Sequence, residues 1–543
     1  MSDNASAPAA APKREEWSGQ LGFILSAIGS AVGLGNIWRF PGVAYEHGGG
    51  AFMVPYIIAL LTAGIPILFL DYAIGHRFRG AAPTAFRRIG GRALEHLGWF
   101  QVAICCAIAV YYTAIIGWAV SYFVFSFDLR WGADSAGFLT KEYLQVGEVG
   151  VSMEFVPGVL IPLVLVWAAT IFTLASGLTK GLERANVIFL PLLVVAFLAL
   201  VVRALFLDGA AQGLEALFTP NWAALGDTEV WIAAYSQIFF SLSVAFGIMV
   251  TYSSYRKRRA NLTTPGLVVA FANSSFEVLA GIGVFATLGF FAFQQGIPVS
   301  ELEGITGVGL SFITFPAIVS QMPGGPIFGL LFFGSLTMAG FTSLLSILQV
   351  ISAGFQEKFG LTPRQAAIRI GVVLAVISVL LFSTTTGLHA LDTIDNWANN
   401  IGIVLSAILT CVVVLWVLRR GPELRFHLSS VSTFKVGILW LVLVTVFAPV
   451  LLGYMLYSRV VTLLNEGYAD YDRWYTDLFG WGTILALAVL TVVLTALPWK
   501  RPVDDFRSWP ELPARMTLGR GESITFQTAV GSAGAPGKKG AGR

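Results

Sequence analysis

The chain has 543 residues, of which 56% are hydrophobic and only 12% are charged, and its net charge at pH 7 is +3. Soluble domains carry about 25% charged residues, so this composition excludes an ordinary soluble protein and predicts an integral membrane protein in contact with the lipid bilayer. The small net charge gives no reason to expect a nucleic-acid partner. Cys105, Cys106 and Cys411 lie in apolar runs and predict neither a disulfide framework nor a zinc site.

Apolar runs long enough to cross a bilayer recur about twelve times along the chain and predict an all-α fold. The predicted spans lie near 19–44, 51–76, 98–127, 155–176, 185–206, 231–255, 266–294, 327–355, 364–383, 393–418, 434–460 and 477–499. Residues 1–16 are polar and lack the apolar core of a cleaved signal peptide. We therefore expect the first span to stay in the mature protein as an anchor.

Basic residues gather in three of the connections between the predicted spans, all of them on the same predicted side. Clusters follow the second, sixth and tenth spans, at 77–92, 256–259 and 419–425. The opposite connections 295–326 and 384–392 contain no Lys or Arg. Because Lys and Arg are retained on the cytoplasmic side, we expect both termini in the cytoplasm and the protein in the inner or plasma membrane. Residues 295–326 are also too apolar for a plain loop and predict a re-entrant or capping segment.

The first span is interrupted between Gly29 and Phe40. Its three glycines each cost about 1 kcal/mol in helix propensity. Arg39 adds a charge that costs at least ~2.5 kcal/mol at membrane depth when it is unpaired. Irregular backbone survives at this depth only where protein buries it or water lines it. The stretch therefore predicts a broken helix that holds a polar ligand.

The sixth span repeats this anomaly between Gln237 and Gly247, where an amide, two hydroxyls and a glycine interrupt the apolar run. Interruptions at corresponding positions of two halves indicate an inverted-repeat transporter. Neutral oxygens and freed carbonyls suit Na⁺, whereas a divalent ion would normally draw several carboxylates. Freed amides at the N-terminus of a half-helix suit a substrate carboxylate.

The stretch from Trp17 to Arg77 carries a more specific signal. It contains Gly33-Leu34-Gly35-Asn36-Ile37-Trp38-Arg39-Phe40-Pro41 and Gly48-Gly49-Gly50-Ala51-Phe52. These motifs resemble those of the neurotransmitter:sodium symporter family, and the resemblance extends over roughly residues 14–500. It implies about twelve transmembrane helices arranged as a 5+5 inverted repeat with unwound first and sixth helices, followed by two additional C-terminal helices.

The domain organisation that this resemblance implies has six parts. They are a cytoplasmic tail at 1–16, a first repeat at 17–206, an extracellular loop at 207–230, a second repeat at 231–419, two further spans at 420–499 and a cytoplasmic tail at 500–543.

The resemblance also implies two sodium sites, a substrate site and two gates. The first sodium site would comprise Ala31, Asn36, Ser241 and Asn273. The second would comprise Gly29, Val32, Ala339, Thr342 and Ser343. The substrate would contact Ala31, Leu34, Gly35, Ile108, Tyr112, Phe240, Ser241, Ser243, Val244, Ala245, Phe246 and Ile347. The outer gate would comprise Arg39, Asp395, Tyr112 and Phe246, and the inner gate Arg14, Trp17, Tyr255 and Glu357.

Two positions narrow the expected substrate and ion requirements. Amine carriers of the family have Asp where this chain has Gly33, so its absence favours substrates that bring their own carboxylate. Chloride-dependent members resemble this chain around Tyr56 and Gln237 but have Ser where it has Glu277. A carboxylate there can replace the chloride charge and predicts chloride independence, with proton antiport on the return step. The alternative is a structural, permanently neutral Glu277.

The sequence thus predicts a sodium-coupled symporter that imports neutral amino acids by alternating access. Ala245 and Leu344 favour small or medium aliphatic substrates over Trp or Tyr. The runner-up is a proton-coupled amino-acid permease of the same fold, which should lack the pair Thr342 and Ser343. An ion channel would need a ring of charges or a repeated filter, and an enzyme would need a nucleophile–base or metal constellation. Neither pattern is visible, so we do not expect an enzyme.

Overall fold

The computed structural model describes residues 15–302, 304–305, 307–503, 506, 509–510, 516–518 and 522–524. Within these residues, ten helical segments are long and apolar enough to cross a membrane. They are Gly50–Phe78 (η1, α4, η2 and α5), Ala82–Phe125 (α6), Pro157–Ala175 (α8), Leu178–Leu205 (η4 and α9), Thr263–Gln295 (α13), Gly325–Phe359 (α16), Pro363–Phe382 (α17), Gly387–Val417 (α18, η8, α19 and η9), Ile438–Asn465 (α21, η10 and α22) and Arg473–Ala496 (α23, η11 and α24).

The first and sixth predicted spans are the two that form no continuous helix of this length. The first consists of α1 (Gln20–Ala31), α2 (Leu34–Ile37) and α3 (Arg39–Glu46), and the sixth of α11 (Thr228–Ser241) and α12 (Ile248–Ser254). Together with the ten continuous segments, they account for the twelve predicted spans. The all-α membrane fold with interrupted first and sixth helices is confirmed.

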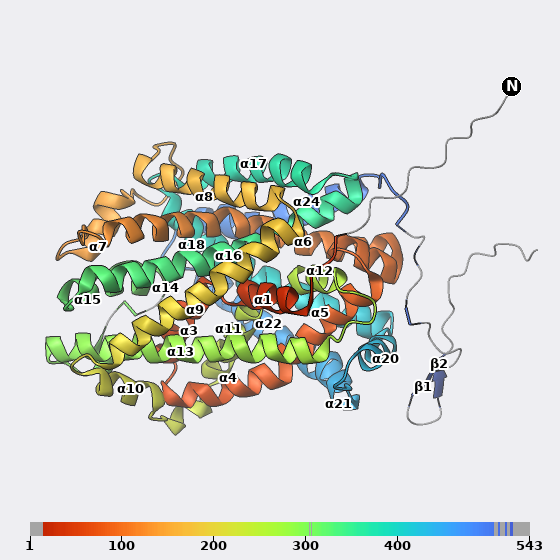
Figure 1. The fold of residues 1–543 in the computed structure, drawn as a ribbon, viewed down its shortest axis with the longest axis horizontal. Helices are drawn as coiled ribbons and strands as arrows, with labels where there is room; N and C mark the ends of the chain where they lie inside the picture. Colours follow the sequence, from red (N-terminus) through yellow and green to blue (C-terminus); the bar gives the residue numbers. More distant parts are fainter. Residues whose placement is uncertain are drawn as a thin grey trace, which may run out of the picture.

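The long helices lie side by side along the longest axis of the molecule (Figure 1). The segment α1 lies in the middle of this bundle and packs against α16, α9, α13 and α12. The longest helices, α6 and α16, pack against each other, and α24 packs on α6. The broken spans are therefore enclosed by continuous helices, which is the condition under which irregular backbone is stable at membrane depth.

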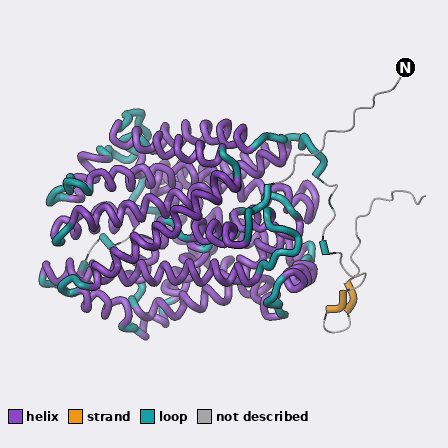
Figure 2. Tube along the Cα trace, in the orientation of Figure 1, coloured by secondary structure: helices purple, strands orange, loops and turns teal. Residues whose placement is uncertain are grey.

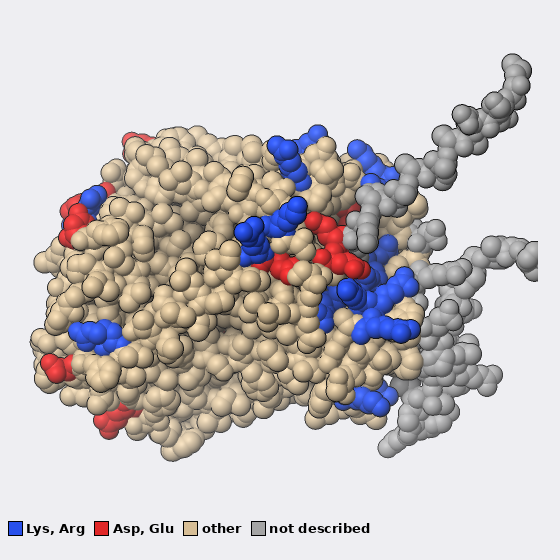
Figure 3. Space-filling model, viewed as in Figure 1, with Lys and Arg blue, Asp and Glu red and all other residues tan. Residues whose placement is uncertain are grey.

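Helix dominates the described chain, and the strands β1 (Met516–Leu518) and β2 (Glu522–Ile524) form one small antiparallel pair at the end of the molecule (Figure 2). Charged side chains gather toward the two ends of the molecule and leave a broad uncharged zone between them (Figure 3). Lys and Arg are most concentrated at the end near β1 and β2 in this view. This distribution agrees with a multi-pass membrane protein.

Short helices lie in the connections between the long ones. They are α7 (Ser135–Gly137), η3 (Phe138–Tyr143), α10 (Ala210–Phe218), η5 (Trp222–Gly226), η6 (Val299–Glu301), α14 (Gly307–Gly309), η7 (Leu310–Thr314) and α15 (Phe315–Gln321). Of these, α7, α10 and α15 lie toward the end opposite β1 and β2 (Figure 1). Phe312 of η7 is fully buried, and its ring lies 6.2 Å from that of Trp38 and 5.8 Å from that of Trp118. The apolar segment 295–326 thus caps the bundle through its described residues, as its composition predicts.

At the other end, the connection after the second span differs from the expected loop. The helix α6 begins at Ala82 and continues through a kink, where Gly91 has φ of 72°. The buried carboxylate of Glu95 accepts from Lys358 Nζ at 2.6 Å and from Trp499 Nε1 at 2.9 Å. These bonds tie the segment to α16 and the C-terminal region, and such long-range partners are invisible to a local sequence pattern. Nearby, α20 spans Gly421–Val431.

Candidate functional site

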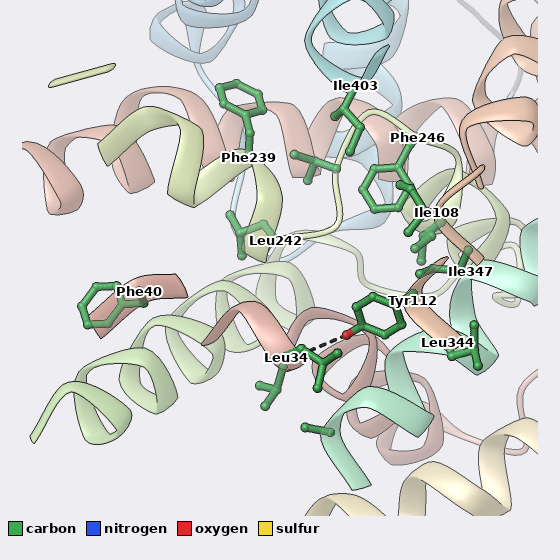
Figure 4. Packing of buried hydrophobic residues seen from close by; sticks show 14 of the residues in the cluster. Leu34, Phe40, Ile108, Tyr112, Phe239, Leu242, Phe246, Leu344, Ile347 and Ile403 are labelled. Atoms are coloured by element: carbon green, nitrogen blue, oxygen red, sulfur yellow. Dashed lines mark hydrogen bonds between the residues drawn. The ribbon is translucent and has the colours of Figure 1, made fainter. Parts of the chain in front are cut away.

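The first break is an extended turn between α1 and α2. Val32 has ψ of 96°, and Gly33 has φ of −128° and ψ of −163°. The Gly33 amide donates to Asn36 Oδ1 at 2.9 Å, and the Leu34 amide donates to the Tyr112 hydroxyl at 3.0 Å (Figure 4). The two amides freed by the break are therefore bonded to side chains instead of water, and Tyr112 joins α6 to the break.

The second break runs from Leu242 to Gly247. Ser243 and Ala245 have positive φ values of 54° and 66°, and Gly247 has φ of 88°. The Ala245 amide donates to Asp71 Oδ2 at 2.9 Å, and its carbonyl accepts from Ser406 Oγ at 2.6 Å. An unpaired backbone group at this depth costs several kcal/mol. These bonds therefore stabilise the non-helical conformation of the backbone at Ala245. Asp71 was not among the predicted site residues, although a carboxylate within the second apolar run is itself a signal of function.

The two breaks are joined to α16 at one backbone carbonyl. The Ser30 carbonyl accepts from Ser243 Oγ at 3.0 Å and from Ser343 Oγ at 3.2 Å. One oxygen of the first span thus contacts side chains from the sixth and eighth spans. The polar residues that interrupt three separate apolar runs are therefore brought together at a single place.

A cavity lies at this junction. It is lined by Ser30, Ala31, Gly33, Gly35, Asn36, Ile108, Tyr112, Phe240, Ser241, Ser243, Phe246, Ser343, Ile347, Asn399 and Ile403. Most of the predicted substrate residues are among them, and Figure 4 shows Ile108, Tyr112, Phe246 and Ile347 grouped together. Asn399 and Ile403 also line the cavity, which the sequence pattern did not predict, and they reach it from the continuous segment Gly387–Val417.

Three of the predicted substrate contacts do not line this cavity. Leu34, Val244 and Ala245 are buried behind it, although the Leu34 amide is bonded to Tyr112, which lines the cavity. The two backbone groups of Ala245 are bonded to other helices. Leu344 is also buried and absent from the lining. Ala245 and Leu344 therefore do not limit the size of the substrate side chain by lining this cavity. The apolar wall is instead formed by isoleucine and phenylalanine side chains.

Three of the residues predicted for the first sodium site are buried and linked by side-chain hydrogen bonds. Asn36 Nδ2 donates to Asn273 Oδ1 at 2.8 Å, and Asn273 Nδ2 donates to Ser241 Oγ at 3.1 Å. Ala31 lines the same cavity. The hydrogen bonds link the first, sixth and seventh spans, and Asn36, Asn273 and Ser241 supply only neutral oxygens.

Glu277 lies one helical turn after Asn273 and is fully buried. Its carboxylate accepts from Gln237 Nε2 at 2.6 Å and from the Tyr56 hydroxyl. Both donors were expected around a chloride or its replacement. A buried carboxylate needs such donors, because an unsatisfied buried charge costs several kcal/mol.

The residues predicted for the second sodium site lie where α1 ends beside α16. A Cβ added at Gly29 would lie 3.5 Å from Thr342 Cβ, so the two elements are in contact there. Thr342 Oγ1 lies 3.1 Å from the carbonyl of Ala339. Val32 follows at the α1 terminus, and Ser343 is bonded to the neighbouring Ser30 carbonyl. The predicted residues are therefore close together in the structure, although they come from two segments that are far apart in the sequence.

The predicted outer gate is only partly assembled. The Arg39 guanidinium lies 4.6 Å from the centre of the Phe240 ring. Asp395 Oδ1 accepts instead from Asn399 Nδ2 at 2.7 Å. Within the described part of the chain, Arg39 and Asp395 make no direct ion pair. A second cavity, lined by Arg39, Phe240 and Asn399 among others, adjoins the first on this side.

The predicted inner gate packs tightly around Trp17. Its indole Nε1 donates to the Tyr252 carbonyl at 2.9 Å, and its ring lies edge-on to that of Tyr255 at 6.3 Å. Gln349 Nε2 donates to the Tyr255 hydroxyl at 3.0 Å. Glu357 accepts the Ala81 amide at 2.9 Å, just before α6 begins. Arg14, the fourth predicted member, lies outside the described residues.

Comparisons with known proteins agree with this architecture. A model of the sodium:neurotransmitter symporter family matches residues 14–145 and 133–501. An uncharacterized sodium-dependent transporter of Methanocaldococcus jannaschii is 38% identical over 489 residues, which cover 89% of this chain and 97% of that protein. The sodium- and chloride-dependent GABA transporter 2 of Mus musculus is 30% identical over 529 residues, covering 89% of this chain and 86% of that protein.

A solved structure is also similar. MhsT in complex with L-phenylalanine matches with a TM-score of 0.70 and 33% sequence identity, covering 82% of this chain and 100% of that one. The family consists of sodium-coupled transporters and not of enzymes. The fold, the two interrupted spans and these matches lead to one conclusion: the chain belongs to the sodium:neurotransmitter symporter family.

Proposed function

We propose that the protein is a symporter that imports neutral amino acids across the cytoplasmic membrane together with sodium, independently of chloride. The observation that carries this proposal is the meeting of two helix breaks at one cavity lined by neutral oxygens and apolar side chains. Sodium dependence is a property of the family, whereas the substrate class, the ion stoichiometry and chloride independence are our inferences.

Two sodium ions are proposed, and both would contact the residues at the end of α1. Ala31, Asn36, Ser241 and Asn273 would hold the first ion together with the substrate carboxylate. The carbonyls of Gly29, Val32 and Ala339 and the hydroxyls of Thr342 and Ser343 would hold the second. Because the first ion and the carboxylate neutralise each other, each raises the affinity for the other, and this reciprocity couples the two fluxes.

The proposed substrate is an amino acid with an apolar side chain. Its carboxylate would contact the amides of Leu34 and Gly35 and the Tyr112 hydroxyl, near the N-terminal end of a short helix that favours an anion. Its amino group would contact the carbonyls of Ala31, Phe240 and Ser241 and the hydroxyl of Ser243. The apolar wall suits an aliphatic or aromatic side chain. The L-phenylalanine bound to MhsT supports the amino-acid class.

Chloride independence follows from Glu277, whose carboxylate supplies a fixed negative charge where it contacts Tyr56 and Gln237. Once sodium and substrate have left, a proton on this carboxylate would restore neutrality before the empty carrier reorients. We therefore propose proton antiport on the return step. A permanently neutral Glu277 is the competing interpretation, and it predicts transport without proton exchange.

Alternating access would proceed through the broken spans. Segments 17–206 and 231–419 are proposed as the two inverted repeats, with the extracellular loop 207–230 between them. Residues 420–499 would add two peripheral spans, and 1–16 and 500–543 would be cytoplasmic tails. Arg39 and Asp395, with Tyr112 and Phe246, would close the outer side. Arg14, Trp17, Tyr255 and Glu357 would close the inner side. In support, the Trp17 region is densely packed whereas Arg39 and Asp395 are not yet paired.

The test is uptake of a panel of neutral amino acids by the full-length protein in proteoliposomes. We expect accumulation under an inward sodium gradient, abolition by a sodium ionophore and no change when gluconate replaces chloride. The lumen should become alkaline during uptake if protons leave in exchange. Accumulation driven by a proton gradient without sodium would favour the proton-coupled permease instead, and sodium-indifferent uptake would contradict the proposal.

A further inference from the structure

A buried amide on α9 (Arg184–Leu205) faces the end of α1. Asn186 is fully buried, and its Oδ1 would lie 2.1 Å from a Cβ added at Gly29. The absence of a side chain at Gly29 is therefore what admits the amide. The same added Cβ would lie 3.5 Å from Thr342 Cβ. The Asn186 oxygen thus borders the place where the proposed second sodium site is formed.

The orientation of this amide is set by its other end. Asn186 Nδ2 donates to the Leu182 carbonyl at 2.9 Å. A carbonyl can only accept, so a flipped amide would oppose two acceptor oxygens there. The nitrogen must point to Leu182, and the oxygen must point toward Gly29.

Within the described structure, no hydrogen-bond donor lies within reach of Asn186 Oδ1. Buried side-chain oxygens are almost always satisfied, because leaving one without a partner costs about 1–3 kcal/mol. The neighbouring Thr342 hydroxyl does not fill this role, because it already donates to the carbonyls of Met338 and Ala339 at 3.1 Å and so offers a lone pair here instead of a free proton. A small monovalent cation satisfies all of these groups at once, and a divalent ion is disfavoured because no carboxylate takes part.

We propose that Asn186 is an oxygen ligand of the second sodium ion. This inference rests on the proposed function and adds a residue from the fifth span to a set otherwise drawn from the first and eighth. The amide contributes a neutral oxygen ligand, so it strengthens sodium binding without changing the charge of the site. It also makes the affinity for sodium depend on the packing of α9 against α1.

The experiment compares wild-type protein with Asn186→Leu and Asn186→Ala in the full-length chain. Leucine keeps the branched shape of asparagine but removes the unpaired oxygen. Two quantities are measured: the half-saturating sodium concentration for amino-acid uptake, and the increase in melting temperature that sodium causes in detergent without substrate. Ser335→Ala is the matched control, because Ser335 is a buried, unpartnered hydroxyl on α16 in the described structure.

We expect Asn186→Leu to raise the half-saturating sodium concentration about tenfold, in line with the loss of one buried polar contact. The sodium-dependent increase in melting temperature should shrink, while the melting temperature without sodium stays equal or rises. Ser335→Ala should leave the sodium response unchanged. A purely structural role predicts the reverse pattern, namely lower stability without sodium and an unchanged sodium response.

The outcomes separate this inference from the proposed function. If the wild-type protein responds to sodium but both Asn186 variants match it, the ligand assignment is overturned while sodium coupling stands. If the wild-type protein itself shows no sodium response in either measurement, the proposed function fails first. Should Asn186→Leu not fold, Asn186→Ala provides the same comparison with a smaller side chain.

Discussion

The Tyr112 hydroxyl accepts the Leu34 amide at 3.0 Å, and this bond spans from the longest helix of the bundle to the first residue after the first break. The same Tyr112 oxygen would lie 2.8 Å from a Cβ at Gly33. The Tyr112 side chain therefore holds the Leu34 amide in position and also limits the size of the residue that can occupy position 33. When a substrate carboxylate enters, the Leu34 amide and the Tyr112 hydroxyl can both donate hydrogen bonds to it.

The first prediction concerns that phenol. Tyr112→Phe removes one donor to the substrate carboxylate, and hydrogen bonds to charged groups contribute about 1.5–3 kcal/mol. We expect KM for amino-acid uptake to rise at least tenfold with little change in melting temperature. Tyr143→Phe is the matched control, because Tyr143 is another buried phenol whose hydroxyl bonds Ser121 Oγ at 2.9 Å, outside the cavity. Equal KM values in the two variants would remove Tyr112 from the substrate site.

The second prediction concerns Gly33, where amine carriers of the family have Asp. An added Cβ would lie 2.8 Å from the Tyr112 hydroxyl and 3.2 Å from Ser343 Oγ. Overpacking of this kind costs about 1–3 kcal/mol. We expect Gly33→Asp to reduce amino-acid uptake at least tenfold without producing amine transport, because the neighbouring phenol leaves no room for the carboxylate.

The control for this prediction is Gly19→Ala, since nothing lies within 4 Å of a Cβ at Gly19. Both variants are compared in uptake assays with an amino acid and with the corresponding amine. Retained amino-acid uptake in Gly33→Asp would mean that the break adjusts to the larger side chain and that the contact with Tyr112 is not restrictive.

The third prediction concerns Glu277. In Glu277→Ser the fixed charge beside Tyr56 and Gln237 is lost and space for an anion is created, so we expect uptake to require chloride. Glu277→Gln keeps the size of the side chain but removes the charge, so we expect it to be inactive with and without chloride. Uptake is measured in chloride and in gluconate for both variants. Chloride-indifferent uptake by Glu277→Ser would contradict the charge-replacement role.

The two breaks could be predicted from the sequence because their residues are glycine, polar or charged, and such residues are unfavourable in a membrane helix. Gly33, Asn36 and Arg39 disturb an apolar run in a way that local reasoning detects. Asn399 and Ile403 could not be found in this manner, because they lie in a continuous helical segment and reach the cavity only through packing. The lack of a direct ion pair between Arg39 and Asp395 could not be predicted either, because it depends on the hydrogen bond that Asp395 makes with Asn399 in the folded chain.

The last prediction concerns a histidine pair at the end of the bundle where α5 (Ile65–Phe78) meets α20. His76 Nε2 lies 2.9 Å from the Lys257 carbonyl, and His76 Nδ1 lies 2.9 Å from His427 Nε2. The carbonyl can only accept, so His76 carries its proton on Nε2 and His427 donates from Nε2. His427 Nδ1 then remains a buried acceptor to which no described residue donates a hydrogen bond.

Burial, followed by the neighbouring His76 and Arg77, lowers the pKa of His427 well below its usual value. The folded protein therefore keeps His427 neutral, whereas the unfolded chain binds a proton below about pH 6.5. Linkage requires the free energy of unfolding to fall as the pH drops through this value, by at most about 1.4 kcal/mol per unit for one group. Above about pH 7 the histidine contributes no pH dependence.

The measurement is the melting temperature of the full-length protein in detergent between pH 8 and pH 5. We expect a plateau above pH 7 and a decline below about pH 6.5, and a smaller decline in His427→Leu, because leucine cannot titrate. His96→Leu is the control, since His96 is partly exposed and, among the described residues, bonds carbonyls of its own helix. A decline of equal size in wild type and His427→Leu would show that other groups govern the acid response, and it would leave the histidine pair as a packing contact alone.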